Sequence, residues 1–153
     1  MPGKSRTRKP TQPAMSPLLR ALTYTRAAHE PVTEAMLLQC YTALDAFRRG
    51  HGSRDLFVTL GRQLLVAEEL GRLGHEPYAL PDVEAAHSAM MHIDIAEKKD
   101  GIWLISDADY AQLCVALEIF DRQLSVASLG DIARAEAQML EGVLRSARNT
   151  AIA

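Results

Sequence analysis

Glu84 and His87 have the Glu-x-x-His spacing that di-iron proteins use to bind metal inside helical bundles. Such a site needs a second copy of the motif and further inward carboxylates, and the sequence has no second copy. His92 follows His87 by five residues, about 140° further round a helix, whereas metal-binding histidines on one helix are usually three or four residues apart. A metal-dependent helical enzyme is therefore an alternative that the pattern does not favour, and we expect no metal or other cofactor.

No other residue pattern is typical of catalysis. The glycines between residues 61 and 74 lack the Lys and Ser/Thr of a phosphate-binding loop, and the sequence has no Gly-x-Ser-x-Gly elbow. Cys40 and Cys114 have no neighbouring histidine in a known arrangement, and each falls in a helix-like apolar pattern that predicts a buried free thiol. We therefore expect the protein not to be an enzyme.

The charge is divided unevenly along the chain. Of 17 basic and 19 acidic residues, residues 1–26 hold six basic and no acidic ones, so this part carries +6 and the rest −8. Lys4, Arg6, Arg8 and Lys9 could contact the phosphates of a nucleic acid or another polyanion. A solvated tail, or one that docks on the acidic body of the same chain, is the alternative interpretation.

Residues 1–17 are rich in Pro, Ser, Thr and Gly and have almost nothing to bury, which predicts a basic, disordered tail. Residues 18–153 then form a single helical domain. No apolar stretch is long enough to span a membrane. Pro10, Pro13 and Pro17 interrupt the region where a signal peptide would be apolar, so we expect a cytoplasmic protein.

Composition favours helices throughout this domain, because Leu and Ala dominate the apolar residues and aromatic residues make up only 5%. Hydrophobic periodicity predicts an all-α fold of about five helices in an antiparallel, bundle-like arrangement. Prolines and capping residues mark the expected helix starts: Pro31, Ser53, Pro81, Ser106 and Ser128. In the last helix we expect Ile132, Met139, Leu140 and Val143 to face inward, and fraying from Asn149 onward.

Residues 102–105 (IWLI) are the only strongly β-like run. Four residues cannot form a sheet alone, so we expect an extended plug between helices rather than a strand paired with residues 21–25. Trp103, together with Met90 and Met91, would make an adaptable contact surface for a protein partner if exposed, and ordinary core filler if buried. Burial is the expected outcome.

Three segments carry a resemblance to other proteins: TRKP in the tail, YTALDAFRRGHGSRDLFVTLGRQLLVAEEL in the middle and ALEIFDRQLSVAS near the end. The chain resembles short uncharacterised helical proteins encoded by proteobacterial phages and integrative mobile elements. The resemblance implies a mobile-element accessory factor that binds or inhibits a host protein complex, and it transfers no catalytic residue. We therefore expect a non-enzymatic interaction protein, with a nucleic-acid-associated regulator that uses the basic tail as the alternative.

Overall fold

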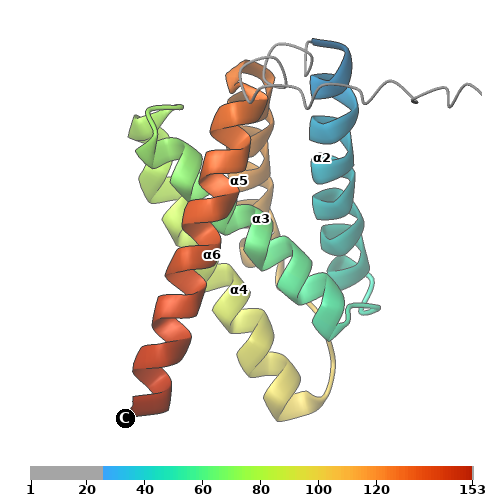
Figure 1. The fold of residues 1–153 in the computed structure, drawn as a ribbon. Helices are drawn as coiled ribbons and strands as arrows, with labels where there is room; N and C mark the ends of the chain where they lie inside the picture. Colours follow the sequence, from blue (N-terminus) through green and yellow to red (C-terminus); the bar gives the residue numbers. More distant parts are fainter. Residues whose placement is uncertain (1–25, 153) are drawn as a thin grey trace, which may run out of the picture.

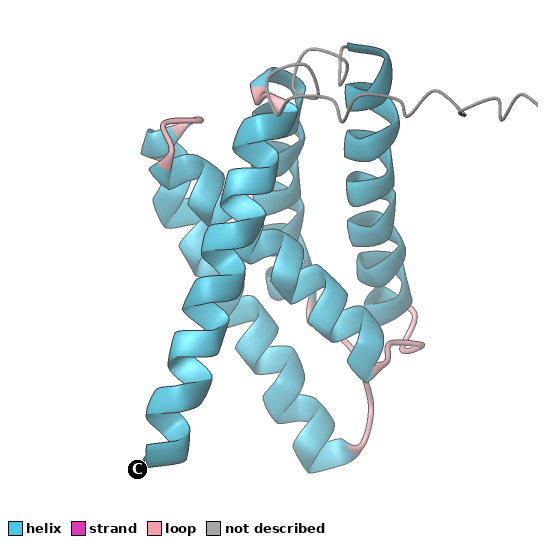
Figure 2. Ribbon diagram, viewed as in Figure 1, coloured by secondary structure: helices cyan, strands magenta, loops and turns pink. Residues whose placement is uncertain are grey.

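The structure is a computed structural model that describes residues 26–152. Within these residues the chain forms five α-helices, one short 3-10 helix and no strand (Figure 2). The elements are α2 (Arg26–Arg48), α3 (Arg54–Arg72), η1 (Pro77–Ala79), α4 (Leu80–Asp100), α5 (Asp107–Val126) and α6 (Leu129–Ile152). The predicted all-α fold of five helices is confirmed. The domain boundary predicted at residue 17 lies outside the described residues.

Helix α3 lies at the centre of the fold and contacts each of the other four α-helices. Helices that follow one another run in roughly opposite directions, as Figure 1 shows. Helix α4 also packs on α5, and α5 on α2, whereas the main contact of α6 is with α3 alone. The core around α3 contains Leu60, Leu64 and Leu70, with Phe47 from α2 and Phe120 from α5, all fully buried.

Side-chain hydroxyl groups fix where three helices begin, as the sequence predicts. Backbone N–H groups of the first turn donate to these hydroxyls: Leu56 to Ser53 (3.2 Å), Asp109 to Ser106 (3.2 Å) and Asp131 to Ser128 (3.1 Å). Helix α4 has Pro81 in its first turn and ends at Gly101, which adopts a left-handed conformation with φ of 70°.

The start predicted for the first helix is wrong by five residues. Helix α2 begins at Arg26, and Pro31 lies inside it rather than at its first position. Pro31 is the sixth residue of the helix and so lies beyond the first four N–H groups, which have no partner within a helix. It therefore removes one intrahelical hydrogen bond, to the carbonyl group four residues earlier, and weakens the first turns of α2.

Residues 102–105 form an extended segment with alternating exposure. Ile105 is buried and Trp103 is half-buried, whereas Ile102 and Leu104 are about half exposed. Alternation of this kind is expected of extended backbone, whose successive side chains point in opposite directions. Among the described residues the segment pairs with no strand, in agreement with the predicted plug; residues 21–25 lie outside them.

The prediction for the last helix is correct in its first half and wrong in its second. Ile132 and Met139 are buried, but Leu140 and Val143 are 45% and 46% exposed. The apolar pattern continues, but the helix extends past its contact with α3 and away from the body (Figure 1). Helix α6 also continues to Ile152, past the fraying point predicted at Asn149.

The two cysteines are expected to differ in reactivity. Both are free, with Cys40 buried and Cys114 half-buried. Burial raises the pKa of Cys40 to about 12, so at pH 8 it has roughly a thousandfold less reactive thiolate than an ordinary cysteine. In a titration with Ellman's reagent we expect the fast phase to belong to Cys114 and to disappear in Cys114→Ser. A fast phase lost in Cys40→Ser instead would contradict the burial of Cys40.

Candidate functional site

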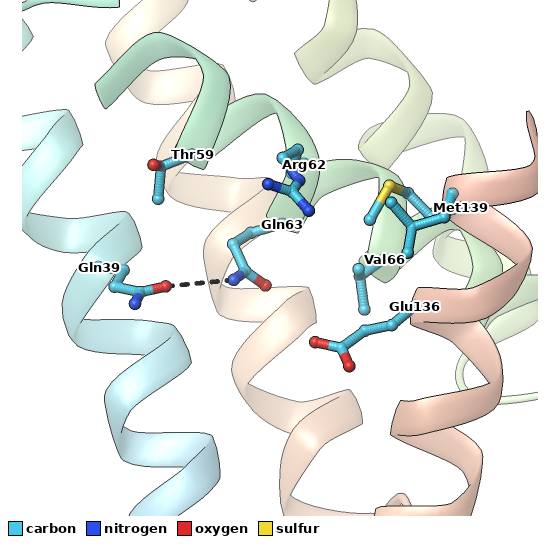
Figure 3. A pocket seen from close by; sticks show the side chains of 8 residues that line it. Gln39, Thr59, Arg62, Gln63, Val66, Glu136 and Met139 are labelled. Atoms are coloured by element: carbon cyan, nitrogen blue, oxygen red, sulfur yellow. Dashed lines mark hydrogen bonds between the residues drawn. The ribbon is translucent and has the colours of Figure 1, made fainter. Parts of the chain in front are cut away.

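A pocket of about 380 Å³ opens between α2, α3 and α6. Helix α3 forms its floor, while α2 and α6 stand on either side (Figure 3). The volume falls in the range of ligand-binding pockets. Eight residues line the pocket: Gln39, Thr59, Arg62, Gln63, Val66, Glu136, Met139 and Leu140. We call this site the α2–α6 groove.

Helical spacing places these side chains on shared faces. In α3, the adjacent Arg62 and Gln63 lie three or four residues from both Thr59 and Val66. In α6, the adjacent Met139 and Leu140 follow Glu136 by three and four residues. The serine caps that start α3 and α6 set the first residues of both helices. Local sequence thus determines which residues face the groove, and packing of both helices on the body brings the faces together.

The polar side chains of the groove have unused hydrogen-bonding capacity. Gln63 Nε2 donates to Gln39 Oε1 at 3.3 Å, but the buried Gln63 Oε1 has no partner among the described residues. Figure 3 shows this single bond crossing from α3 to α2. An unpartnered buried oxygen costs about 1–3 kcal/mol, so it calls for an explanation.

The charged side chains of the groove take part in none of the ion pairs within the described part of the chain. Arg54 and Arg122 pair with carboxylates across helices or loops. In contrast, no ion pair within residues 26–152 includes Arg62 or Glu136, although both line the groove. Val66 and Met139 provide a buried apolar surface beside these charges. The groove therefore offers one positive charge, one negative charge, amide groups and an apolar floor.

The lining of the groove is suited to holding a ligand. Of the side-chain types that can act as nucleophiles it contains Thr59 and Glu136, with no serine, cysteine, histidine or lysine beside them. No group of three or more metal-ligating side chains that could hold an ion occurs in the described part of the chain. The side chains of the groove can hold a ligand by hydrogen bonds, charge and apolar contact.

The structure gives the helical histidines carboxylate partners. His87 Nε2 lies 2.8 Å from Glu68 Oε2 on α3, and His92 Nδ1 lies 3.0 Å from Asp109 Oδ1 on α5. Glu84 is exposed on α4. These contacts link α4 to its two neighbours, α3 and α5.

Pairing and burial explain the shifted pKa values outside the groove. Hydrogen bonds from Lys98 and then Arg54 lower the pKa of Asp94, and a hydrogen bond to Glu76 raises that of Arg122. These groups lie on the surface in ion pairs that connect elements of the fold. Their shifts need no catalytic explanation.

The partner surface predicted around Trp103 is divided in the structure. Met90 is only 4% exposed and belongs to the core, as expected, whereas Met91 is 64% exposed and is not core filler. The two methionines separate because α4 turns about 100° between consecutive residues. Trp103 is half-buried, with its ring centroid 6.0 Å from that of Phe47 and 5.5 Å from that of Phe57.

The other predicted contacts, Lys4, Arg6, Arg8 and Lys9, lie outside the described residues. Sequence reasoning missed the groove altogether. A polar stripe at helical spacing, Thr59, Arg62 and Gln63, was its only local signal. The opposing Gln39 is 24 positions away from Gln63, and nothing in the local pattern links the two.

None of the helices in residues 26–152 has the length and apolar character required to cross a membrane. Comparisons with family models, curated proteins and solved structures found no match. The geometry of the groove and the charge of the chain are therefore the basis for assigning a function.

Proposed function

We propose that this protein is a non-enzymatic interaction protein that binds a segment of a partner protein in the α2–α6 groove. The observation that carries the proposal is the unpartnered Gln63 Oε1 in a groove that also holds Arg62 and Glu136 outside any ion pair of the described residues. Such groups destabilise an isolated protein slightly and gain partners when a ligand binds.

A polypeptide suits the groove better than a polyanion. The amide groups of Gln39 and Gln63 match the donors and acceptors of a peptide backbone, and the apolar floor can receive one side chain. Arg62 could bind a phosphate, but Glu136 in the same groove would repel it. A site with one positive and one negative charge instead suits a peptide segment that carries both an acidic and a basic side chain.

The resemblance suggests the kind of partner, and the two free cysteines suggest the cellular compartment. The resemblance to mobile-element proteins suggests a subunit of a host complex as the partner. Two free cysteines are in keeping with a reducing compartment, and so we place the protein in the cytoplasm.

Selection of peptides from a random display library with the full-length protein tests the proposal. We expect bound peptides whose affinity falls in groove variants such as Arg62→Glu. Peptides that bind Arg62→Glu as tightly as the wild type would contradict it. The alternative would gain support if the protein bound a DNA or RNA oligonucleotide with steep salt dependence, and lost that binding on removal of residues 1–10.

Gln63→Met is expected to raise the free energy of unfolding by about 1 kcal/mol and to weaken peptide binding at least tenfold. Methionine has a similar shape without the unpartnered oxygen, so removing that cost outweighs the loss of the weak bond to Gln39. Urea denaturation and fluorescence polarisation with a selected peptide measure the two effects.

Gln112→Met is the matched control. Gln112 also donates a single side-chain hydrogen bond, to the carbonyl oxygen of Asp82 at 3.1 Å, but it lies outside the groove. This variant should leave peptide affinity unchanged and should not raise stability. Equal changes in the free energy of unfolding in the two variants would contradict the cost of the buried oxygen. Equal changes in peptide affinity would contradict the groove as the binding site.

A further inference from the structure

The end of α6 is an apolar helix face that the described body does not cover. Every residue from 140 to 152 is exposed, a length of about 20 Å of helix. Figure 1 shows this end projecting from the rest of the fold. An exposed apolar stripe nevertheless runs along it at helical spacing: Leu140, Val143, Leu144, Ala147 and Ala151.

Three large apolar side chains of the stripe lie next to one another and are about half exposed. Val143 and Leu144 are 46% and 57% exposed, and Leu140 beside them is 45% exposed. Single exposed apolar residues are common, whereas a contiguous set at helical spacing marks a contact surface. Some further helix or surface is needed to cover it.

The charges beside the stripe identify what covers it. Glu141 and Arg148 are seven residues apart and therefore flank the same side of the stripe, one near each end. Consider a second copy of this helix that packs antiparallel, with residue 146 of one copy opposite residue 146 of the other. Glu141 of one copy and Arg148 of the other then differ by only about 5 Å in their positions along the helix axis. Two-fold symmetry repeats this pair, so two opposite-charge contacts form.

A parallel arrangement forms neither contact, because it sets the flank that carries Glu141 and Arg148 on opposite edges of the interface in the two copies. It would also bring both bodies to the same end of the helix pair. The antiparallel arrangement sets the bodies at opposite ends, and it places Ile152 of the second copy near Leu140 at the edge of the groove. Ile152 is 86% exposed in the single chain and so is available for this contact.

We infer that residues 140–152 of α6 are a self-association surface that pairs antiparallel with the same residues of a second copy. This inference goes beyond the proposed function, because it concerns a partner other than the groove's ligand. The overlap is short, so the dimer is weak, with a dissociation constant on the order of 100 µM.

Sedimentation velocity of the full-length protein, from about 10 µM to about 1 mM, tests the inference. We expect a concentration-dependent dimer whose dissociation constant rises at least tenfold in Leu144→Asp. Leu38→Asp is the matched control, because Leu38 is similarly exposed but lies on α2, and it should dimerise like the wild type. A wild-type protein that stays monomeric at the highest concentration overturns the inference.

Charge exchange tests the antiparallel geometry separately. Glu141→Arg and Arg148→Glu should each weaken the dimer several-fold, since each places like charges opposite one another. The double variant E141R/R148E should restore wild-type affinity. Circular dichroism checks that all variants stay folded, as expected at exposed positions. Failure of the double variant to recover affinity would overturn the antiparallel pairing.

The two inferences can be distinguished by variants, although Leu140 lines the groove and also begins the stripe. Gln63→Met should lose peptide binding and keep the dimer, whereas Leu144→Asp should lose the dimer and keep peptide binding. A monomeric protein that binds groove peptides would therefore support the proposed function while overturning self-association.

Discussion

Phe47→Ala is expected to lower the free energy of unfolding by about 3–5 kcal/mol. Phe47 is fully buried at the end of α2, and its ring centroid lies 6.0 Å from that of Trp103. Truncation removes a large apolar contact and leaves a cavity between α2 and the 102–105 plug. The neighbouring Gly52 has no side chain to fill that cavity. Urea denaturation followed by fluorescence measures the loss, because Trp103 is the only tryptophan in the chain.

Tyr41→Ala is the matched control on the same helix. Tyr41 is 45% exposed, so its truncation should cost less than about 1 kcal/mol. Far-UV circular dichroism gives a second signal, because Phe47→Ala also changes the surroundings of Trp103. Similar costs for the two aromatic residues would show that the end of α2 is not packed as the structure describes.

Elements that depend on local chemistry could be predicted from the sequence. Ser53, Ser106 and Ser128 start their helices because a hydroxyl next to an apolar-periodic run can accept from a first-turn N–H group. Apolar spacing also predicts the inward stripe of α5. Tyr110 at its start is partly buried, and the other members are buried: Leu113, Leu117, Phe120 and Leu124.

Features that depend on distant contacts could not be predicted. Periodicity marks Leu140 and Val143 as one apolar face with Met139, but it does not show where the body that covers that face ends. The groove poses the same problem, since Gln39, Gln63 and Glu136 come from three helices whose packing no local pattern specifies. Their meeting depends on tertiary packing around α3.

Gly52→Ala is expected to lower the free energy of unfolding by about 2–3 kcal/mol. A Cβ at this position would lie 2.3 Å from Phe47 Cδ1 and 2.5 Å from Trp103 Cβ, which is too close for carbon atoms. The buried ring has little room to move, so the loop between α2 and α3 must shift. The same denaturation experiment measures the cost.

Gly142→Ala is the control for the glycine substitution itself. A Cβ at Gly142 meets nothing within 4 Å, and the residue lies inside α6. Alanine should therefore stabilise this helix by about 0.5–1 kcal/mol, through its higher helix propensity. Opposite signs for the two substitutions would assign the loss at Gly52 to crowding rather than to the change of residue type.

The double variant F47A/G52A separates the two crowded contacts of Gly52. Without the Phe47 ring, the added methyl group occupies part of the cavity, so Gly52→Ala should cost less than half of what it costs in the wild type. A remainder should persist, because the 2.5 Å approach to Trp103 Cβ is unchanged. Strictly additive losses would mean that the loop moves away from α2 in Gly52→Ala, and that the Phe47 ring does not limit the space at Gly52.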